Sequence, residues 1–430
     1  MPDIYLAPIT KTPKATLSLP GSKSIANRVL LLAAVANGDS IIHNVPEVAE
    51  DVVLMLEALT TLGVIIQKIS HKDNLSSYKI SGGNGVFPVK NASIFCGNSG
   101  TSIRFLTSML AFMDGQYELT GIERMKERPI SDLVEAIQMV GADITYSENI
   151  GYPPLNTGMF IDNKIAVINI SGRVSSQYLT GLLMALPLLR RKITVSIKDE
   201  LISKPYIDIT VAIMQKFGCH IEINGSDYTI NPIEYLKAVE YTIEPDASSA
   251  SYFLALGAIR GDITINNLSN NSLQGDKEFA KCLDIMGAEV SYQTNAINVR
   301  SKFIKPININ MEAMPDVAMT LAVLALFAHG TSVITGIRSW KVKETDRILA
   351  MYTELTKLGA SVSITDDSIE ISPPAKINPD VAIDTYNDHR MAMCFSLVVA
   401  YGVPVTIREY QCVGKTFANY FDIFKQICYI

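Results

Sequence analysis

Residues 253–268 read FLALGAIRGDITINNL, an apolar helical run, a glycine, and then the alternation typical of a half-buried strand. The same order recurs with steps of 69 to 77 residues between turn positions, one of which, Arg191, lacks the glycine. A regular period of this kind predicts repeated α/β units. The other five copies are VLLLAAVANGDSIIHNV (29–45), LTSMLAFMDGQYELTG (106–121), LTGLLMALPLLRRKITVSI (179–197), LAVLALFAHGTSVITGI (321–337) and FSLVVAYGVPVTI (395–407).

A second helix-turn-strand pattern follows each of the first five copies by 25 to 29 residues. Its glycines stand where a helix C-cap takes a left-handed conformation: Gly63, Gly141, Gly218, Gly287 and Gly359. The sixth copy ends before its last strands, whereas the early segment IYLAPI (4–9) is a strand without a unit. We therefore expect the start of the chain to complete the last repeat.

Six units grouped as two sets of three predict an α/β protein with two similar domains, between which the chain crosses near residues 20 and 240. The expected domains are 1–20 plus 241–430, and 21–240. Repeat proteins can also stack as a solenoid and only bind partners, but each unit here is much longer than a usual solenoid repeat.

Charge and composition restrict the function. The 430 residues carry a net charge of −6, which argues against nonspecific nucleic-acid binding. The six cysteines form no zinc-binding cluster and are expected to be buried, reduced thiols. The N-terminus resembles no signal or transit peptide, and the apolar runs are too short to span a bilayer, so we expect a cytoplasmic protein without membrane or metal.

The starts of the predicted helices are rich in Ser, Thr, Asn and Asp, as in GSKSIANR (21–28) and GNSGTSIR (97–104). N-capping explains such residues, but not the cations beside them, because a cation opposes the helix dipole. A polyanionic ligand would explain both, and Ser24 and Arg28 are expected to present hydroxyl and guanidinium on one face. The cations are Lys23, Arg28, Arg104, Arg128, Lys204, Lys343, Arg347, Arg390 and Lys415.

The motif GSKS (21–24) could be part of a nucleotide-binding P-loop. Leu17 and Ser18 stand where the first glycine of that motif belongs, so the match fails and a P-loop kinase is not expected.

Nine motifs in order along the chain closely resemble the 5-enolpyruvylshikimate-3-phosphate synthases. They are LPGSKSIANR (19–28), GNSGTSIR (97–104), RPISDL (128–133), SGRVSSQYLTGLLMALPLL (171–189), SKPYIDIT (203–210), EPDASSASYFLA (244–255), PDVAMT (315–320), WKVKETDR (340–347) and TYNDHRMAM (385–393).

The resemblance implies the enolpyruvyl transferase fold, an inside-out α/β barrel in which two domains of three βαβαββ repeats have the active site in the cleft between them. It also implies transfer of the enolpyruvyl group of phosphoenolpyruvate to the 5-hydroxyl of shikimate 3-phosphate, by addition and elimination through a tetrahedral intermediate. No cofactor is implied. The family is usually monomeric, its pathway leads to aromatic amino acids, and glyphosate is an expected inhibitor.

By the same resemblance, shikimate 3-phosphate is held by Lys23, Ser24, Arg28, Ser175, Ser176, Gln177, Ser203, Tyr206, Asp316, Ser339 and Lys343. Phosphoenolpyruvate is held by Lys23, Asn98, Gly100, Thr101, Arg128, Gln177, Arg347, Arg390 and Lys415. Arginine suits this role because its planar fork matches carboxylate and phosphate oxygens.

The reaction needs groups that deliver and remove protons, and the resemblance points to Asp316, Glu344 and Lys23. Without it, Asp316 and Glu344 would be read as acids that complement helix dipoles. Neighbouring cations and burial should shift the pKa of Glu344 in opposite directions. His389 is expected to be a structural, hydrogen-bonding histidine rather than a contact near the reacting atoms.

Two positions depart from the family pattern. Ser339 stands where Asn is common, so a contact to shikimate 3-phosphate could require a bridging water. Phe105 stands where Pro is common, and a shift of the nearby Gly100 and Thr101 would alter glyphosate sensitivity.

Two other readings stay open. The related transferase that uses UDP-N-acetylglucosamine typically carries a reactive cysteine in its second repeat, but residues 97–218 contain no cysteine. A noncatalytic anion-binding repeat protein would be expected to have lost Lys23, Asp316 and Glu344, which are all present.

Overall fold

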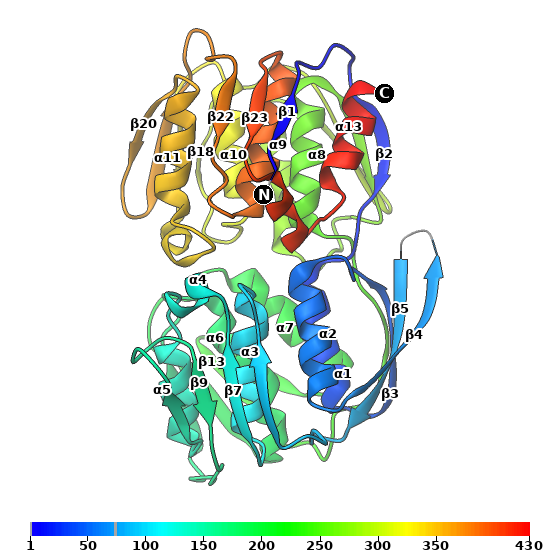
Figure 1. Ribbon diagram of the computed structural model, residues 1–430, viewed down its shortest axis with the longest axis vertical. Coiled ribbons are helices and arrows are strands. Elements are labelled where there is room, and N and C mark those ends of the chain that lie inside the picture. The colour runs from blue at the N-terminus through cyan, green and yellow to red at the C-terminus, as the bar shows by residue number, and fades with distance from the viewer. Residues whose placement is uncertain (1, 73–74) are drawn as a thin grey trace. The chain divides into compact units, whose positions relative to one another are not determined.

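A computed structural model describes residues 2–72 and 75–430 (Figure 1). In the described residues, five four-stranded sheets share one strand order. The repeat with β6 (Asn91–Phe95), β7 (Gln116–Thr120), β8 (Ile144–Tyr146) and β9 (Leu155–Thr157) shows the pattern. The first two strands are parallel, and the fourth strand lies antiparallel between the second and the third, giving the order β6-β7-β9-β8. Helices α3 (Gly100–Ala111) and α5 (Ser131–Val140) complete a βαβαββ unit, with the short α4 (Glu123–Lys126) before α5.

The chain divides into two compact units. The second unit, Gly21–Ile243, holds three such repeats. Its first repeat is α1 (Lys23–Val35), β3 (Asn37–Val45), α2 (Glu50–Thr61), β4 (Ile65–Lys72) and β5 (Leu75–Gly83), with β14 (Glu240–Thr242) as its first strand. Its third repeat is β10 (Val167–Ile170), α6 (Ser176–Ala185), η1 (Leu186–Leu189), β11 (Ile193–Ile197), α7 (Lys204–Lys216), β12 (Ile221–Asn224) and β13 (Asp227–Ile230).

The first unit, Met1–Pro20 and Glu244–Ile430, has the full pattern twice and a third repeat whose sheet has three strands, in the order β1-β23-β22, among the residues described. One repeat is β2 (Lys14–Ser18), α8 (Ala247–Arg260), β15 (Asp262–Asn266), η2 (Gly275–Glu278), α9 (Phe279–Ile285), β16 (Glu289–Gln293) and β17 (Ala296–Arg300). The next is β18 (Asn308–Asn310), α10 (Ala318–Leu324), η3 (Ala325–Phe327), β19 (Ser332–Thr335), η4 (Arg338–Val342), α11 (Arg347–Lys357), β20 (Ser361–Ile364) and β21 (Ser368–Ser372). The last is β22 (Val381–Ile383), α12 (His389–Phe395), η5 (Ser396–Tyr401), β23 (Val405–Ile407), η6 (Tyr410–Lys415), α13 (Tyr420–Tyr429) and β1 (Ile4–Leu6).

Strand β1 pairs antiparallel with β23, so the start of the chain completes the last repeat as predicted. The five glycines expected to end helices are also confirmed. All have a positive φ between 84° and 112°, at Gly63, Gly141, Gly218, Gly287 and Gly359.

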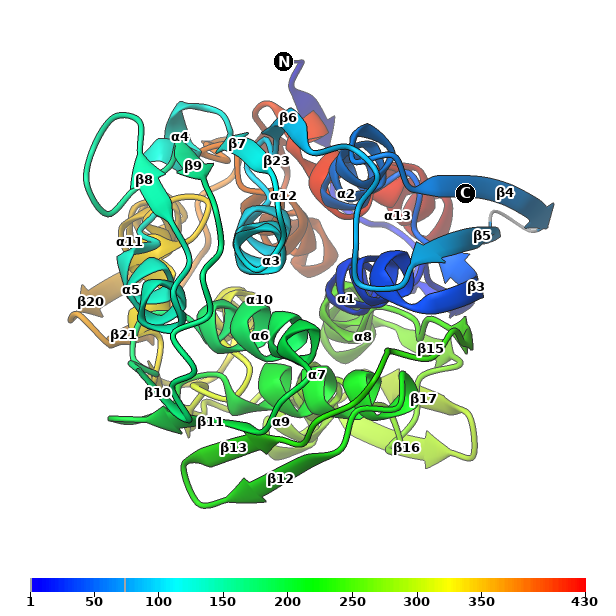
Figure 2. The same ribbon diagram turned by 90° about the horizontal axis from the view of Figure 1, so that it is seen from below.

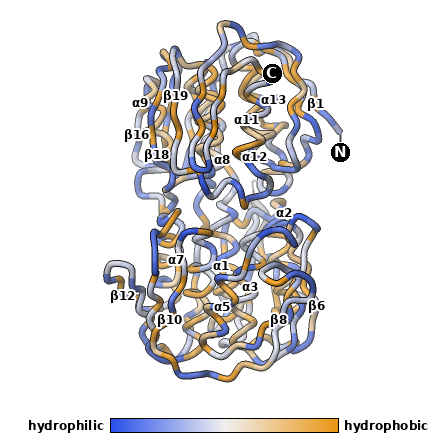
Figure 3. The backbone as a smooth tube through the Cα atoms, turned by 90° about the vertical axis from the view of Figure 1, so that its left-hand side faces the viewer, coloured by the Kyte–Doolittle hydropathy of each residue, from blue (hydrophilic) through white to orange (hydrophobic). Residues whose placement is uncertain are grey.

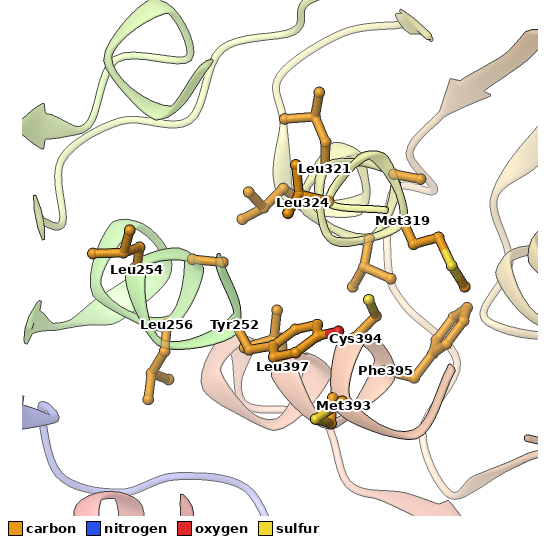
Figure 4. Packing of buried hydrophobic residues seen from close by; sticks show 14 of the residues in the cluster. Tyr252, Leu254, Leu256, Met319, Leu321, Leu324, Met393, Cys394, Phe395 and Leu397 are labelled. Carbon is orange, nitrogen blue, oxygen red and sulfur yellow. The ribbon is translucent and has the colours of Figure 1, made fainter. Parts of the chain in front are cut away.

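The first helix of each repeat forms the core, and the strands lie outside it. Figure 2 shows α1, α3 and α6 in the middle of the second unit, surrounded by strands. Figure 4 shows the corresponding side chains of α8, α10 and α12 packed together in the first unit. Coloured by hydropathy, the backbone shows hydrophobic stretches in the interior of both units (Figure 3). At Gly181 of α6, an added Cβ would lie 2.7 Å from the Ser108 hydroxyl of α3, so the two helices require a glycine at this contact.

Three of the inner helices are shorter than their apolar runs predict, because each continues as a 3-10 turn: α6 as η1, α10 as η3 and α12 as η5. Pro187 lies in η1 and has no N–H to continue the α-helical pattern. Nothing in the structure explains the change in η3 or η5.

All six cysteines are buried, as expected, and none forms a disulfide bond in the described chain. Among the residues described, we find no helix with the length and apolar character needed to cross a bilayer.

Candidate functional site

Four helices of the second unit begin at or beside predicted ligand residues. Helix α1 starts at Lys23, α3 at Gly100, α6 at Ser176, and α7 directly after Ser203. The side chains of Ser99 and Ser175 accept hydrogen bonds from Ser102 N and Gln177 N, so capping accounts for part of this polar pattern. Among the described residues, the side chains of Ser22 and Ser203 accept no such cap hydrogen bond.

Arg28 is buried within the second unit and donates to neutral oxygens. Its Nε lies 2.8 Å from Oγ1 of Thr210, and its Nη2 lies 3.3 Å from the Tyr206 carbonyl. Its Nη1 donates to the backbone carbonyl of Ser24 at 2.6 Å. Burial lowers the pKa of Arg28 to about 10. These acceptors hold the side chain in place without cancelling its charge.

A second cluster surrounds Gly100. Arg104 Nη1 donates to Oε1 of Gln177 at 2.9 Å, and Arg128 Nη1 donates to the carbonyl of Asn98 at 2.9 Å and to its Oδ1 at 3.0 Å. A Cβ on Gly100 would lie 2.5 Å from Arg104 Nη1 and 2.7 Å from Arg128 Nη2. A side chain at Gly100 would therefore displace one or both guanidinium groups, a contact that the sequence pattern did not predict.

The two clusters meet through Asn27 and Phe105. Asn27 Nδ2 donates to Oγ1 of the buried Thr101 at 2.8 Å. The Arg28 guanidinium carbon lies 5.2 Å from the centre of the Phe105 ring, within the range of a cation–π contact. Lys204, in contrast, forms an exposed ion pair with Asp208 at 2.7 Å and belongs to neither cluster.

Asp51 is a functional candidate that the sequence reasoning did not single out. Its buried carboxylate lies 2.8 Å from Nζ of Lys23. The signal was present in AEDVV (49–53), but an acid in the first turn of a helix is ordinarily read as a partner of the dipole.

In the first unit, the carboxylate of Asp316 receives three cations. Its Oδ1 accepts from Lys343 Nζ at 3.3 Å and from Arg347 Nη1 at 3.1 Å, and its Oδ2 accepts from Arg390 Nη2 at 2.8 Å. Burial raises the pKa of Asp316, but the charges of Arg390, Lys343 and Arg347 outweigh burial and hold the pKa well below its ordinary value. For Lys343, burial is the leading effect and lowers its pKa.

Arg347 opens α11 and lies among three carboxylates. It donates through Nε to Asp388 at 2.7 Å, through Nη1 to Asp316, and through Nη2 to Oε2 of Glu344 at 2.9 Å. Lys415 Nζ lies 3.8 Å from the other oxygen of Glu344. Asp388 was also missed, although TYNDHRMAM contains it, because its role as the N-cap of α12 hides its contact with Arg347.

His389 does not fulfil the expectation of a hydrogen-bonded structural histidine. Within residues 2–72 and 75–430, neither of its ring nitrogens has a hydrogen-bond partner. Asp388 Oδ1 lies 3.5 Å from Nδ1. Burial, followed by the charge of Arg390, lowers the pKa of His389 well below its ordinary value, so the ring is neutral.

Ser339 lies in η4 and its buried Oγ finds no hydrogen-bond partner in the part of the chain described. The neighbouring Trp340 is fully buried, and its Nε1 donates to the carbonyl of Pro315 at 2.7 Å. This contact fixes the backbone next to Asp316, so Trp340 joins the residues that position the site.

The clusters around Arg28 and Gly100 in the second unit differ in electrostatics from the cluster around Asp316 and Arg347 in the first unit. Arg28 and Arg104 donate to neutral oxygens, whereas Arg347 and Arg390 donate to carboxylates of their own unit. The predicted need for an anionic ligand therefore applies most directly to the second unit. In the first unit, a ligand anion would compete with Asp316 and Glu344 for the same cations.

The comparisons with known proteins agree with this chemistry. A family model described as EPSP synthase (3-phosphoshikimate 1-carboxyvinyltransferase) matches residues 9–424. The 3-phosphoshikimate 1-carboxyvinyltransferase of Burkholderia lata is 48% identical over 423 residues, 96% of each chain, and that of Paraburkholderia phytofirmans is 46% identical over 433 residues, 98% of each. Among solved structures, an EPSP synthase from Acinetobacter baumannii has a TM-score of 0.82 at 24% identity, covering 100% of this chain and 98% of that one. The enolpyruvyl transferase NikO from Streptomyces tendae has a TM-score of 0.77 at 15% identity, covering 99% and 97%.

Proposed function

This chain belongs to the EPSP synthase (3-phosphoshikimate 1-carboxyvinyltransferase) family, and from this premise we propose that its active site is made of the residues around Arg28 and Gly100 and of those around Asp316 and Arg347. The protein transfers the enolpyruvyl group of phosphoenolpyruvate to shikimate 3-phosphate in aromatic amino acid biosynthesis. What we propose is the assignment of residues to the steps of this reaction.

We assign shikimate 3-phosphate mainly to the second unit. The anionic groups of shikimate 3-phosphate would be bound by Lys23 and Arg28. The other proposed ligands lie at helix starts: Ser24, Ser175, Ser176, Gln177, Ser203 and Tyr206. Free N–H groups and the positive end of the dipole at such starts favour anions. Asp316, Ser339 and Lys343 would add contacts from the first unit, and a water could join the short Ser339 side chain to the ligand.

Phosphoenolpyruvate is assigned to cations of both units: Lys23, Arg128, Arg347, Arg390 and Lys415. Asn98, Gly100, Thr101 and Gln177 would shape the pocket in the second unit. This proposal is supported by the contact of Arg128 with Asn98 and by the position of Gly100 beside two guanidinium groups.

We propose that Asp316, Glu344 and Lys23 move the protons. In the addition, the methylene carbon of phosphoenolpyruvate gains a proton, the 5-hydroxyl loses one, and its oxygen bonds to the adjacent carbon to give a tetrahedral intermediate. In the elimination, phosphate leaves and the new methyl group returns a proton. A bound anion that draws Arg390 and Arg347 away from Asp316 would raise the pKa of that carboxyl toward the range useful for a general base.

The observation that carries the assignment is the double contact of Arg347 with Asp316 at 3.1 Å and Glu344 at 2.9 Å. One buried guanidinium thus holds two of the proposed acid–base groups together, where an incoming anion would reach both.

The test is phosphate release from phosphoenolpyruvate in the presence of shikimate 3-phosphate. We expect Glu344→Gln to lower kcat by about a hundredfold or more, the range of general acid–base catalysis. The exposed Glu370→Gln is the matched control and should behave as wild type. Equal rates in both variants would remove Glu344 from the catalytic groups, and release with UDP-N-acetylglucosamine as acceptor would contradict the acceptor specificity.

Glyphosate is the inhibitor that we propose, with a sensitivity set partly by Phe105. Phe105 lies in α3, five residues after Gly100, at a position where the family commonly has Pro. Its buried ring packs against the guanidinium of Arg28. Phe105→Pro removes this ring and a backbone donor of the helix, so the inhibition constant for glyphosate should change. Equal inhibition constants for the two proteins would contradict this idea.

We further propose a monomeric, cytoplasmic enzyme. The six buried, unpaired thiols of the described chain suit a reducing compartment. Sedimentation of the purified protein would test the monomer, since a dimer would sediment at twice the mass.

A further inference from the structure

We propose that Tyr386 is a positioning residue: its contact with Glu354 holds a strained turn that sets Asp388 and Arg390 against Arg347. This inference rests on the proposed function, because Arg347 and Arg390 are assigned there to phosphoenolpyruvate. The residues involved all belong to the first unit.

The turn itself has an unusual backbone. Tyr386 and Asn387 have φ of +53° and +54°, and the N–H of Asp388 donates to the carbonyl of Thr385 at 2.8 Å. Positive φ at both central residues with this hydrogen bond is the pattern of a type I′ turn, which strongly prefers Gly, Asn and Asp. A bulky tyrosine at its first central position is therefore strained, and such strain persists only where surrounding contacts impose it.

Glu354 provides that contact. Its side chain is fully buried, and its Oε1 accepts from the Tyr386 hydroxyl at 2.7 Å and from Lys357 Nζ at 2.9 Å. Its Oε2 accepts from the N–H of Asp384 at 3.2 Å. Burial and then the bond to Glu354 raise the pKa of Tyr386, so the hydroxyl stays a donor. Although the tyrosine ring is partly exposed, its hydroxyl is tied to a buried carboxylate.

The turn is thereby attached to α11 at two points. Arg347 and Glu354 are seven residues apart and lie on one face of that helix, about 10 Å apart along its axis. Arg347 binds Asp388 at 2.7 Å, and Glu354 binds Tyr386. Asp388 also caps α12, because its Oδ1 accepts from the N–H of Arg390 at 2.9 Å. Fixing the turn at both points fixes the start of α12 and the guanidinium of Arg390.

The test compares two substitutions whose order of severity is informative. Tyr386→Phe keeps the strained side chain but loses the anchor, so we expect KM for phosphoenolpyruvate to rise about tenfold. Tyr386→Gly loses the anchor and also the strain, since glycine adopts positive φ readily, so its KM should rise less. KM for shikimate 3-phosphate should change less than about twofold in both, because its proposed ligands lie mainly in the other unit. Tyr401→Phe, an exposed tyrosine of the same unit, is the control.

The outcomes separate this inference from the proposed function. If Arg347→Gln leaves KM for phosphoenolpyruvate unchanged, the assignment of Arg347 is wrong and the inference fails with it. If Arg347→Gln raises that KM but Tyr386→Phe matches Tyr401→Phe, or Tyr386→Gly is the more damaging change, only the role of the turn is overturned. A crystal structure of Tyr386→Phe should show residues 386 and 387 away from the left-handed region, and an unchanged turn would also overturn the inference.

Discussion

Asp276 shows how a single buried acid can influence stability beside a charged site. It lies in η2 and accepts a hydrogen bond from the hydroxyl of Ser248, at the start of α8. Burial, and then the charge of Asp316, raise the pKa of Asp276 to about 7. The folded chain therefore holds this proton over a pH range in which the unfolded chain, with a carboxyl pKa of about 3.9, releases it.

The sign of the effect follows from linkage. A raised pKa in the folded state contributes stability at low pH that is lost as the pH rises from about 4 to about 7. Asp276→Asn cannot release a proton but can still accept from Ser248, so its melting temperature should fall less than that of wild type between pH 5 and pH 8. The exposed Asp284→Asn should follow the wild-type curve. Parallel curves for all three proteins would show that Asp276 titrates normally.

Some residues of the site could be predicted from the sequence, and others could not. The placement of Asp316, Glu344, Arg347 and Arg390 in one unit follows the predicted order of motifs. The partners Asp51 and Asp388 did not stand out, because an acid at a helix start has a sufficient local explanation. Only tertiary contacts show that Asp388 faces Arg347, 41 residues earlier in the chain.

At the scale of the element, the glycines that end the second helices were predictable because the constraint is local. Gly141 has φ of +112°, and an added Cβ would lie 1.8 Å from the carbonyl oxygen of Ile161. Gly402 ends η5 with φ of +86°, but its Cβ would meet nothing within 4 Å. Alanine at Gly402 would therefore introduce backbone strain alone, whereas alanine at Gly141 would introduce backbone strain and a steric collision.

We expect Gly402→Ala to lower the free energy of unfolding by about 1 kcal/mol, from the left-handed backbone alone. Gly141→Ala should lower it by roughly 3 kcal/mol or more, because the collision with Ile161 is added and a backbone oxygen cannot move away easily. Urea unfolding of both variants measures the difference. Equal losses would mean that the segment around Ile161, which follows β9, shifts without penalty.

The lengths of the inner helices were less predictable than their ends. An apolar run is buried equally well as an α-helix or as a 3-10 turn, so hydrophobicity does not distinguish α10 from η3. The pairing of β1 with β23 was predictable for the opposite reason, since a repeat that lacks a strand leaves an unpaired edge that only a distant segment can fill.

At the scale of the whole molecule, the six repeats explain why the proposed ligands come from distant parts of the sequence. In each unit, side chains at helix starts of different repeats contact one another, as Arg104 and Gln177 do in the second unit and Arg347 and Asp388 do in the first. The proposed function requires one shikimate 3-phosphate to contact both units, through Arg28 and Tyr206 in the second and through Asp316 and Lys343 in the first.

Amide hydrogen exchange tests this requirement. Added shikimate 3-phosphate should slow exchange at the starts of α1, α6 and α7 in the second unit and at residues 338–343 in the first. Because one bound molecule would protect both, the two sets should be protected with the same midpoint concentration. The outer strands β12 and β13 carry no proposed ligand and serve as the internal control. Protection confined to the second unit would contradict the assignment of Asp316, Ser339 and Lys343 to this substrate, while unequal midpoints would indicate two separate binding events.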